Sequence, residues 1–152
     1  MSDENKKIAR KLMEEGWNKG RLDVVDELMS SGCRFHDPVF PSLTNGTENY
    51  KQHVQRCRSG FPDLTFTIED TIEEHNEVVL HWKARGTHRG EFLGMPATNK
   101  SATVSGTSIM RLEKGKIVEQ WSDWNVLSLM EQLGLAAPSH AQTAQQPAKA
   151  RR

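Results

Sequence analysis

The aspartates Asp37 and Asp123 are the side chains in this sequence best suited to acid–base chemistry. A carboxylate whose pKa is raised by burial can take a proton from an acidified carbon and later return it. Asp37 follows His36, and the two could form an acid–base pair, but neighbours on a strand face opposite ways. Alternatively, Asp37 holds an Asp-Pro turn and His36 has an ordinary role. If Asp37 points inward it is the first candidate base, and Asp123 is the second.

The serines Ser108 and Ser122 form a second candidate pair. They stand on the predicted strands 102–112 and 117–123, and residues 113–116 have the composition of the hairpin turn between them. The two hydroxyls could therefore face each other across the hairpin. Because serine cannot act as a carboxylate base at neutral pH, such a pair would orient a ligand without deprotonating it. Alternatively, both are small residues that fit a tightly bent sheet.

The sequence predicts neither a metal site nor a bound cofactor. His81 and His88 are two potential ligands, but acidic or thiol groups do not stand around them at the spacing typical of metal sites. The cysteines Cys33 and Cys57 are too few for a disulfide framework, and we expect both to be free thiols. Motifs of nucleotide-binding loops, zinc proteases and nucleophile elbows do not occur in the sequence.

Length and composition predict one small domain at residues 1–135. In a chain of 152 residues, two cores would leave each half near the lower size limit for folding alone. Lys plus Arg and Asp plus Glu both number 20, which argues against nucleic acid or a membrane surface as partner. The sequence has no secretory leader and no bilayer-spanning run, so the cytoplasm is the expected compartment. Residues 136–152, rich in Ala, Gln and Pro, are expected to be disordered.

The periodicity of apolar residues predicts helices first and strands afterwards. Helices are predicted at 6–19, 21–29, 48–58 and 126–133. Strands are predicted at 33–36, 64–69, 77–85, 102–112 and 117–123. Thr47 is the predicted N-cap of the third helix. This order predicts an α+β fold: a cone-shaped α+β barrel whose strongly bent, mostly antiparallel sheet carries about three N-terminal helices on its concave face.

A cone of this kind can hold a pocket between the first helix, the third helix and the concave face of the sheet. Trp121 and Trp124 are three residues apart, so on a regular strand one ring points into the pocket and the other lies on the outer face. The glycine-rich connection 86–96 has the composition of a flap over the pocket. The side chains expected to line the pocket or bind its ligand are Trp17, Phe35, Phe66, Trp82, Met110, Trp124 and Asn125.

Six segments, in order along the chain, resemble the signatures of the SnoaL-like polyketide (ester) cyclases of the nuclear-transport-factor-2-like superfamily. They are WNKGRLD at 17–23, FHDP at 35–38, FPDL at 61–64, GTHRGEFLGMP at 86–96, GKIVEQW at 115–121 and QLG at 132–134. The resemblance implies an intramolecular aldol cyclisation in a closed apolar pocket, with an aspartate as general base and acid and without metal or cofactor. It also implies a homodimer that pairs through the outer face of the sheet.

The sequence departs from this family pattern at three polar positions. Ser122 stands where the family aspartate follows the tryptophan of the last strand, Asn125 stands at a second acidic position, and Ser108 stands where a histidine can occur. The resulting prediction is a cyclase-type enzyme that acts on a hydrophobic, carbonyl-bearing small molecule, with Asp37, Asp123, Ser122 and Ser108 as candidate catalytic residues. The alternatives are an epoxide hydrolase or isomerase with an inward carboxylate, or a binding protein without a base.

Overall fold

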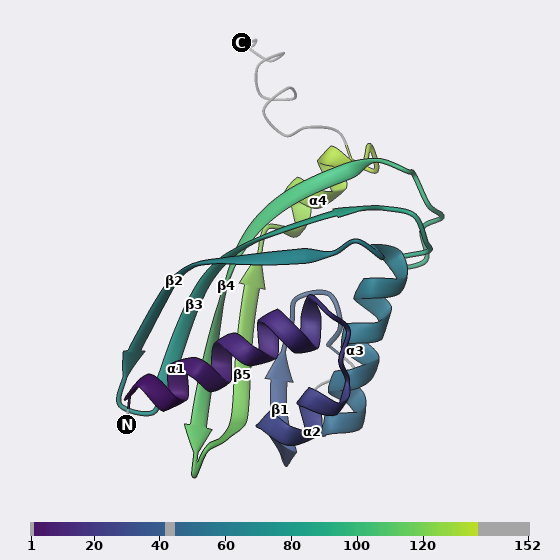
Figure 1. Cartoon of the computed structure of the whole chain (residues 1–152). Coiled ribbons are helices and arrows are strands. Elements are labelled where there is room, and N and C mark those ends of the chain that lie inside the picture. The colour runs from purple at the N-terminus through teal and green to yellow at the C-terminus, as the bar shows by residue number, and fades with distance from the viewer. Residues whose placement is uncertain (1, 42–44, 137–152) are drawn as a thin grey trace.

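A five-stranded sheet curls around the first helix of the chain (Figure 1). The computed structural model describes residues 2–41 and 45–136. The helices are α1 (Ser2–Lys11), η1 (Leu12–Trp17), α2 (Asp23–Leu28), α3 (Thr47–Gly60) and α4 (Val126–Gln132). The strands are β1 (Met29–His36), β2 (Thr65–Glu74), β3 (Glu77–Thr87), β4 (Ser101–Glu113) and β5 (Lys116–Trp124).

The sheet has the strand order β1-β5-β4-β3-β2. Only the β1–β5 pair is parallel, and the other neighbours run antiparallel. Register shifts interrupt the β2–β3 pair after Ile68 and the β4–β5 pair after Arg111. Such bulges bend a strand and increase its twist, which gives the sheet its concave side. The predicted α+β fold with a strongly bent, mostly antiparallel sheet is therefore confirmed.

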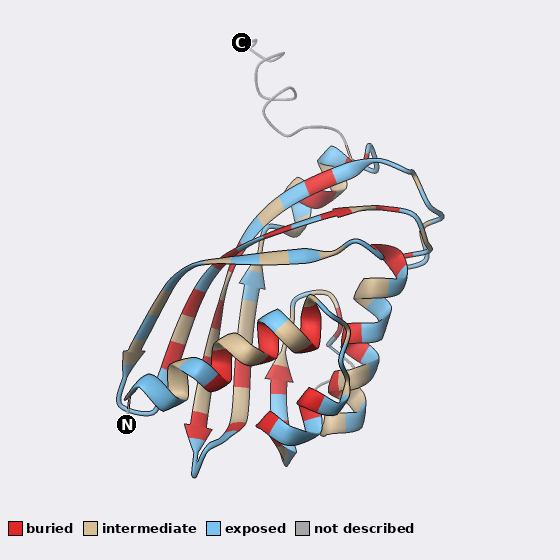
Figure 2. Ribbon diagram, in the orientation of Figure 1, coloured by how far each residue is buried: buried red, intermediate tan, exposed pale blue. Residues whose placement is uncertain are grey.

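Buried residues alternate with more exposed ones along β3 and β4, as the colours along these strands show (Figure 2). The alternation follows from the pleat of a strand, which points successive side chains to opposite faces. At the middle of the sheet, Trp82 of β3 pairs with Gly106 of β4, and Gly106 pairs with Trp124 of β5. Two residues further along β4, Ser108 pairs with Ser122 of β5. This register places two indole rings and two hydroxyls on the concave face.

The first predicted helix changes type before it ends. Its apolar stripe is buried as predicted, but Leu12–Trp17 forms a π-helix, and the Asn18 N–H donates to the Met13 carbonyl at 3.0 Å. The Arg58 guanidinium donates to the Trp17 carbonyl at 2.9 Å and so satisfies a helix end that has no partner within the helix. Turns of this wide kind are frequent at functional sites.

The start of α3 corrects one sequence prediction. The N-cap is Gly46, with a φ of 88°, and it makes no side-chain hydrogen bond, so the prediction of Thr47 as N-cap was wrong. The Gly46 N–H donates to the Cys33 carbonyl at 2.7 Å, which holds the chain beside β1 before the helix begins. A positive φ of this size favours glycine, and this explains why the cap falls one residue earlier.

The Trp121 ring lies on the outer face of the sheet, outside the cone. Trp121 stacks on His36 with ring centroids 5.6 Å apart, and the His36 ring bonds the Glu119 carboxylate at 2.8 Å. Hydrogen bonds from His36 and then from Arg111, partly offset by desolvation, lower the pKa of Glu119. Trp121 and Trp124 thus lie on opposite faces, as their spacing predicts. The homodimer through this face stays a prediction.

None of the helices within 2–41 and 45–136 combines the length and the apolar character that crossing a bilayer requires. The domain limits stay a prediction, and the tail predicted at 136–152 lies outside the described residues from 137 onward.

Candidate functional site

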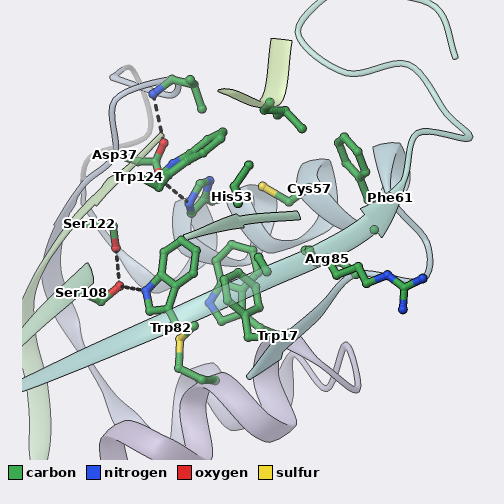
Figure 3. Close-up of a pocket in the computed structure, with 18 of the residues that line it drawn as sticks. Trp17, Asp37, His53, Cys57, Phe61, Trp82, Arg85, Ser108, Ser122 and Trp124 are labelled. Atoms are coloured by element: carbon green, nitrogen blue, oxygen red, sulfur yellow. Dashed lines mark hydrogen bonds and ion pairs between the residues drawn. The ribbon is translucent and has the colours of Figure 1, made fainter. Parts of the chain in front are cut away.

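A cavity opens between η1, α3 and the concave face of β3, β4 and β5 (Figure 3). The space between its walls, including the open mouth, is about 740 Å³. Its walls are mainly aromatic and aliphatic. The connection predicted as a flap contributes Phe92, which is buried against Phe40 and Phe61. A largely apolar pocket with a few polar groups is typical of small-molecule binding.

Four of the seven predicted lining residues do line this cavity: Trp17, Phe66, Trp82 and Trp124. The other three do not. Phe35 is buried behind His53, against which its ring stacks at 5.6 Å, and Met110 is fully buried elsewhere in the core. Asn125 is exposed at the start of α4, where its side-chain oxygen accepts the Ser128 N–H at 2.9 Å. Strand alternation predicts which side chains point into the cone. It does not predict how deep within the cone each side chain lies.

Asp37 points into the cavity, with only 8% of its side chain exposed. Its Oδ1 accepts the Val39 N–H at 3.0 Å, so the residue also holds the turn, and the two interpretations of Asp37 are compatible. Its Oδ2 accepts the Trp124 indole N–H at 3.3 Å and lies 3.6 Å from His53 Nε2. Asp123, the second candidate base, is an exposed residue one position before Trp124.

His53 is a titratable cavity residue that sequence reasoning missed. It lies on the buried side of α3 and is 5% exposed, with its ring 5.1 Å from those of Trp17 and Phe40. Its Nδ1 is buried and has no hydrogen-bond partner among the residues that the structure describes. A carboxylate only accepts, so we assign the ring hydrogen to Nε2 beside Asp37, which leaves a lone pair on Nδ1. Asp37 and His53 thus form a carboxylate–imidazole pair inside an apolar cavity.

The spacing of residues along α3 contains a pattern that could have identified His53 as a buried residue. Tyr50, His53, Val54 and Cys57 follow one another at steps of three, one and three, which puts them on one side of a helix. A histidine on that side must be buried, and a buried histidine needs a reason. The pattern alone does not reveal the carboxylate that approaches from the end of β1.

Hydrogen bonds join the polar groups on another wall of the cavity into one chain. The Trp17 indole donates to the Tyr50 hydroxyl at 3.0 Å, and that hydroxyl donates to Gln120 Oε1 at 2.8 Å. Gln120 Nε2 donates to the Ser122 hydroxyl at 3.1 Å. The remaining links are Ser122 to Ser108 at 2.8 Å and the Trp82 indole to Ser108 at 3.0 Å. The predicted meeting of Ser108 and Ser122 across the hairpin is confirmed, and their catalytic roles stay predictions.

Neither Tyr50 nor Cys57 is ionised at neutral pH. Burial raises the pKa of the Tyr50 hydroxyl, which therefore keeps its proton and remains a donor. Burial, and secondly the charge of Asp37, raise the pKa of the Cys57 thiol in the cavity wall. Since the thiolate is the nucleophilic form, Cys57 is inert in this environment. Within 2–41 and 45–136, no three His, Cys, Asp or Glu side chains gather closely enough to hold a metal ion.

Comparisons with known proteins agree with the resemblance seen in the sequence. The family model for SnoaL-like polyketide cyclases matches residues 7–133. The nogalonic acid methyl ester cyclase of Streptomyces nogalater is 28% identical over 125 residues, which are 80% of this chain and 92% of that protein. The aklanonic acid methyl ester cyclase of Streptomyces sp. strain C5 is 27% identical over 135 residues, which are 84% of this chain and 80% of that protein.

Solved structures share the same fold. A SnoaL-like protein of Jannaschia sp. CCS1 has a TM-score of 0.78 and 27% identity, with 90% of this chain and 94% of that one covered. The protein TsrD of Streptomyces laurentii has a TM-score of 0.76 and 26% identity, with 86% of this chain and 97% of that one covered. These matches span nearly the whole described region.

Proposed function

We propose that this chain, which belongs to the SnoaL-like polyketide cyclase family, is an enzyme that closes a ring in an apolar, carbonyl-bearing small molecule. The observation that carries the proposal is the pair of Asp37 and His53, whose side chains are 8% and 6% exposed inside a largely apolar cavity. Buried titratable groups in a cleft are a common mark of catalytic sites, because burial and unpaired polar atoms are costly to keep.

His53 Nδ1 is the general base in this proposal. Its lone pair takes a proton from a carbon made acidic by an adjacent carbonyl, which gives an enolate and a protonated imidazole ring. The enolate carbon attacks a second carbonyl of the same molecule and forms the new carbon–carbon bond. The resulting alkoxide takes the proton back from His53. Substrate and product are therefore isomers, and the sequence of steps consumes neither water nor an oxidant.

Asp37 serves this chemistry by holding the imidazole ring. Its Oδ2 stabilises the positive charge that His53 acquires, and the ring nitrogen beside it keeps its hydrogen throughout. The Val39 N–H and the Trp124 indole fix the carboxylate from two further sides. A side chain held in this way keeps the imidazole ring in one orientation, so the reaction requires no rearrangement of the base. The base thus lies on α3 and the carboxylate that holds it lies at the end of β1, whereas the resemblance implied an aspartate on β5 as the base.

The test uses the two methyl esters that appear in the names of the two related cyclases. Wild-type protein is incubated with nogalonic acid methyl ester and with aklanonic acid methyl ester, and the products are separated by liquid chromatography with mass detection. We expect a product with the mass of its substrate from at least one of them. Asp37→Asn should lower its rate about a hundredfold, since acid–base groups typically contribute two to four orders of magnitude.

Asp123→Asn is the matched control, because it makes the same chemical change at an exposed carboxylate one residue before Trp124. We expect its rate to equal that of the wild type. Ring closure that survives Asp37→Asn but is lost in Asp123→Asn would contradict the assignment. Binding of the esters without any product would support the binding-protein alternative instead.

A further inference from the structure

We infer that Ser122 presents a hydroxyl hydrogen to the cavity, as a fixed donor for a carbonyl oxygen of the ligand. The inference starts from the two ends of the hydrogen-bonded chain, the indoles of Trp17 and Trp82. An indole nitrogen can donate a hydrogen bond but cannot accept one. Both ends therefore send a hydrogen toward the middle of the chain, where Ser108 and Ser122 meet.

The direction of each bond between Trp17 and Ser122 follows from the first. Tyr50 accepts from Trp17, and its own hydrogen needs an acceptor because the hydroxyl is buried. Gln120 must therefore turn its oxygen toward Tyr50 and its nitrogen toward Ser122, as the contacts at 2.8 and 3.1 Å have it. The opposite amide orientation would leave the buried Tyr50 hydrogen without an acceptor.

The serine pair consequently has one hydrogen more than the chain can use. Ser122 already accepts from Gln120, and Ser108 already accepts from Trp82. The two serines share one bond at 2.8 Å, in which one donates and the other accepts. No bond within the described residues uses the hydrogen of the accepting serine. That hydrogen faces the cavity, since both serines lie on its wall (Figure 3).

The difference in burial between the two serines indicates that Ser122 holds the unused hydrogen. Ser108 is 1% exposed, whereas Ser122 is only half-buried, so a ligand reaches Ser122. With Ser108 as donor in the pair, the Ser122 oxygen accepts two hydrogen bonds and has no lone pair left. Ser122 can then only donate. The ligand group it selects is an acceptor, such as a carbonyl oxygen or the enolate oxygen that forms from it, and not an alcohol or amine hydrogen.

This inference rests on the proposed function only in taking the cavity as the ligand site. If experiments show that Asp37 and His53 transfer a proton, the Ser122 hydroxyl becomes part of the mechanism, because it donates to the oxygen on which the enolate charge develops. If the chain binds ligands without turnover, the preference for a carbonyl remains. Equilibrium binding therefore tests Ser122 separately from catalysis.

The experiment compares the bicyclic ketone 1-tetralone with tetralin, which has the same ring system without the oxygen. Binding to wild type, Ser122→Ala and Ser105→Ala is measured by isothermal titration calorimetry. Ser122→Ala should weaken 1-tetralone binding about fivefold to tenfold, the value of one neutral hydrogen bond, and leave tetralin within about twofold. Ser105→Ala is the matched control, since it makes the same chemical change at an exposed serine on the outer face of β4, and we expect 1-tetralone affinity within about twofold of wild type.

Unchanged 1-tetralone affinity in Ser122→Ala, equal weakening of both probes, or failure of the wild type to bind 1-tetralone would overturn the inference. A second measurement needs no variant. The infrared carbonyl stretch of 1-tetralone bound to the wild type should lie below its position in hexane, because a hydrogen bond weakens the carbonyl bond. A stretch at the hexane position would show that the hydrogen is not delivered.

Discussion

Replacing His53 by glutamine should lower the rate of ring closure about a thousandfold, within the range that general acid–base groups contribute. Glutamine has a similar reach and can donate to Asp37 Oδ2, but its side chain has no nitrogen that takes a proton at neutral pH. The effect should appear in kcat and much less in KM, because the cavity walls that hold the substrate are unchanged. The measurement is steady-state turnover of the ester that the wild type cyclises.

His36→Gln is the matched control for this experiment. His36 is the other histidine near Asp37 in the sequence, but its ring lies on the outer face, against Trp121 and Glu119. We expect wild-type turnover from that variant. His53→Ala adds a further check, because imidazole supplied in the buffer could occupy the vacated space and restore part of the rate. A His53→Gln variant with wild-type kcat would remove His53 from the mechanism.

Gly106→Ala should lower the free energy of unfolding by about 3 kcal/mol, since overpacking a dense core costs about that much. A methyl group at this position would lie 2.5 Å from Trp82 Cζ2 and 2.8 Å from Trp124 Cβ. Real carbon atoms do not approach so closely, so the Trp82 ring must move. Its bond to Ser108 is then strained or lost. The measurement is urea denaturation followed by circular dichroism.

Gly32→Ala makes the same chemical change where nothing lies within 4 Å of the added carbon. We expect its unfolding free energy to differ from wild type by less than about 1 kcal/mol, as for most surface substitutions. Equal stability of Gly106→Ala and Gly32→Ala would mean that the cavity wall around Trp82 is not tightly packed. The position of the Ser108 and Ser122 hydroxyls would then be less fixed than the hydrogen bonds indicate.

Local patterns in the sequence were sufficient to predict the fold and the two neighbouring strands that carry Ser108 and Ser122. Helical spacing and strand alternation act over a few residues, and the hairpin at 113–116 makes β4 and β5 antiparallel neighbours. The register shift after Arg111 then places Ser108 opposite Ser122, and the turn alone does not predict that shift. Alternation also separates Trp121 from Trp124. Predictions that depended only on these short-range rules agree with the structure, apart from the N-cap of α3, which is Gly46 and not Thr47.

The base of the proposed mechanism could not be predicted in the same way. Asp37 comes from the end of β1 and His53 from α3, and their 3.6 Å approach depends on how the helix docks on the sheet. Spacing along the chain does not encode that distance. The inward direction of Asp37 continues the alternation of β1, in which Phe35 is buried and His36 lies on the outer face, and the turn that its Oδ1 holds with Val39 fixes the carboxylate there. Phe35 follows the alternation rule, yet it stacks behind His53 and does not reach the cavity.

Hydrogen exchange at the α-carbon of 1-tetralone in deuterium oxide tests the central claim most directly, because it reports proton removal without requiring the natural substrate. The exchange is followed by proton NMR at neutral pH. We expect wild-type protein and Asp123→Asn to accelerate the loss of the α-hydrogen signal in proportion to protein concentration, whereas Asp37→Asn and His53→Gln leave it near the spontaneous rate. Acceleration by His53→Gln equal to that of the wild type, or none by the wild type, would contradict the claim.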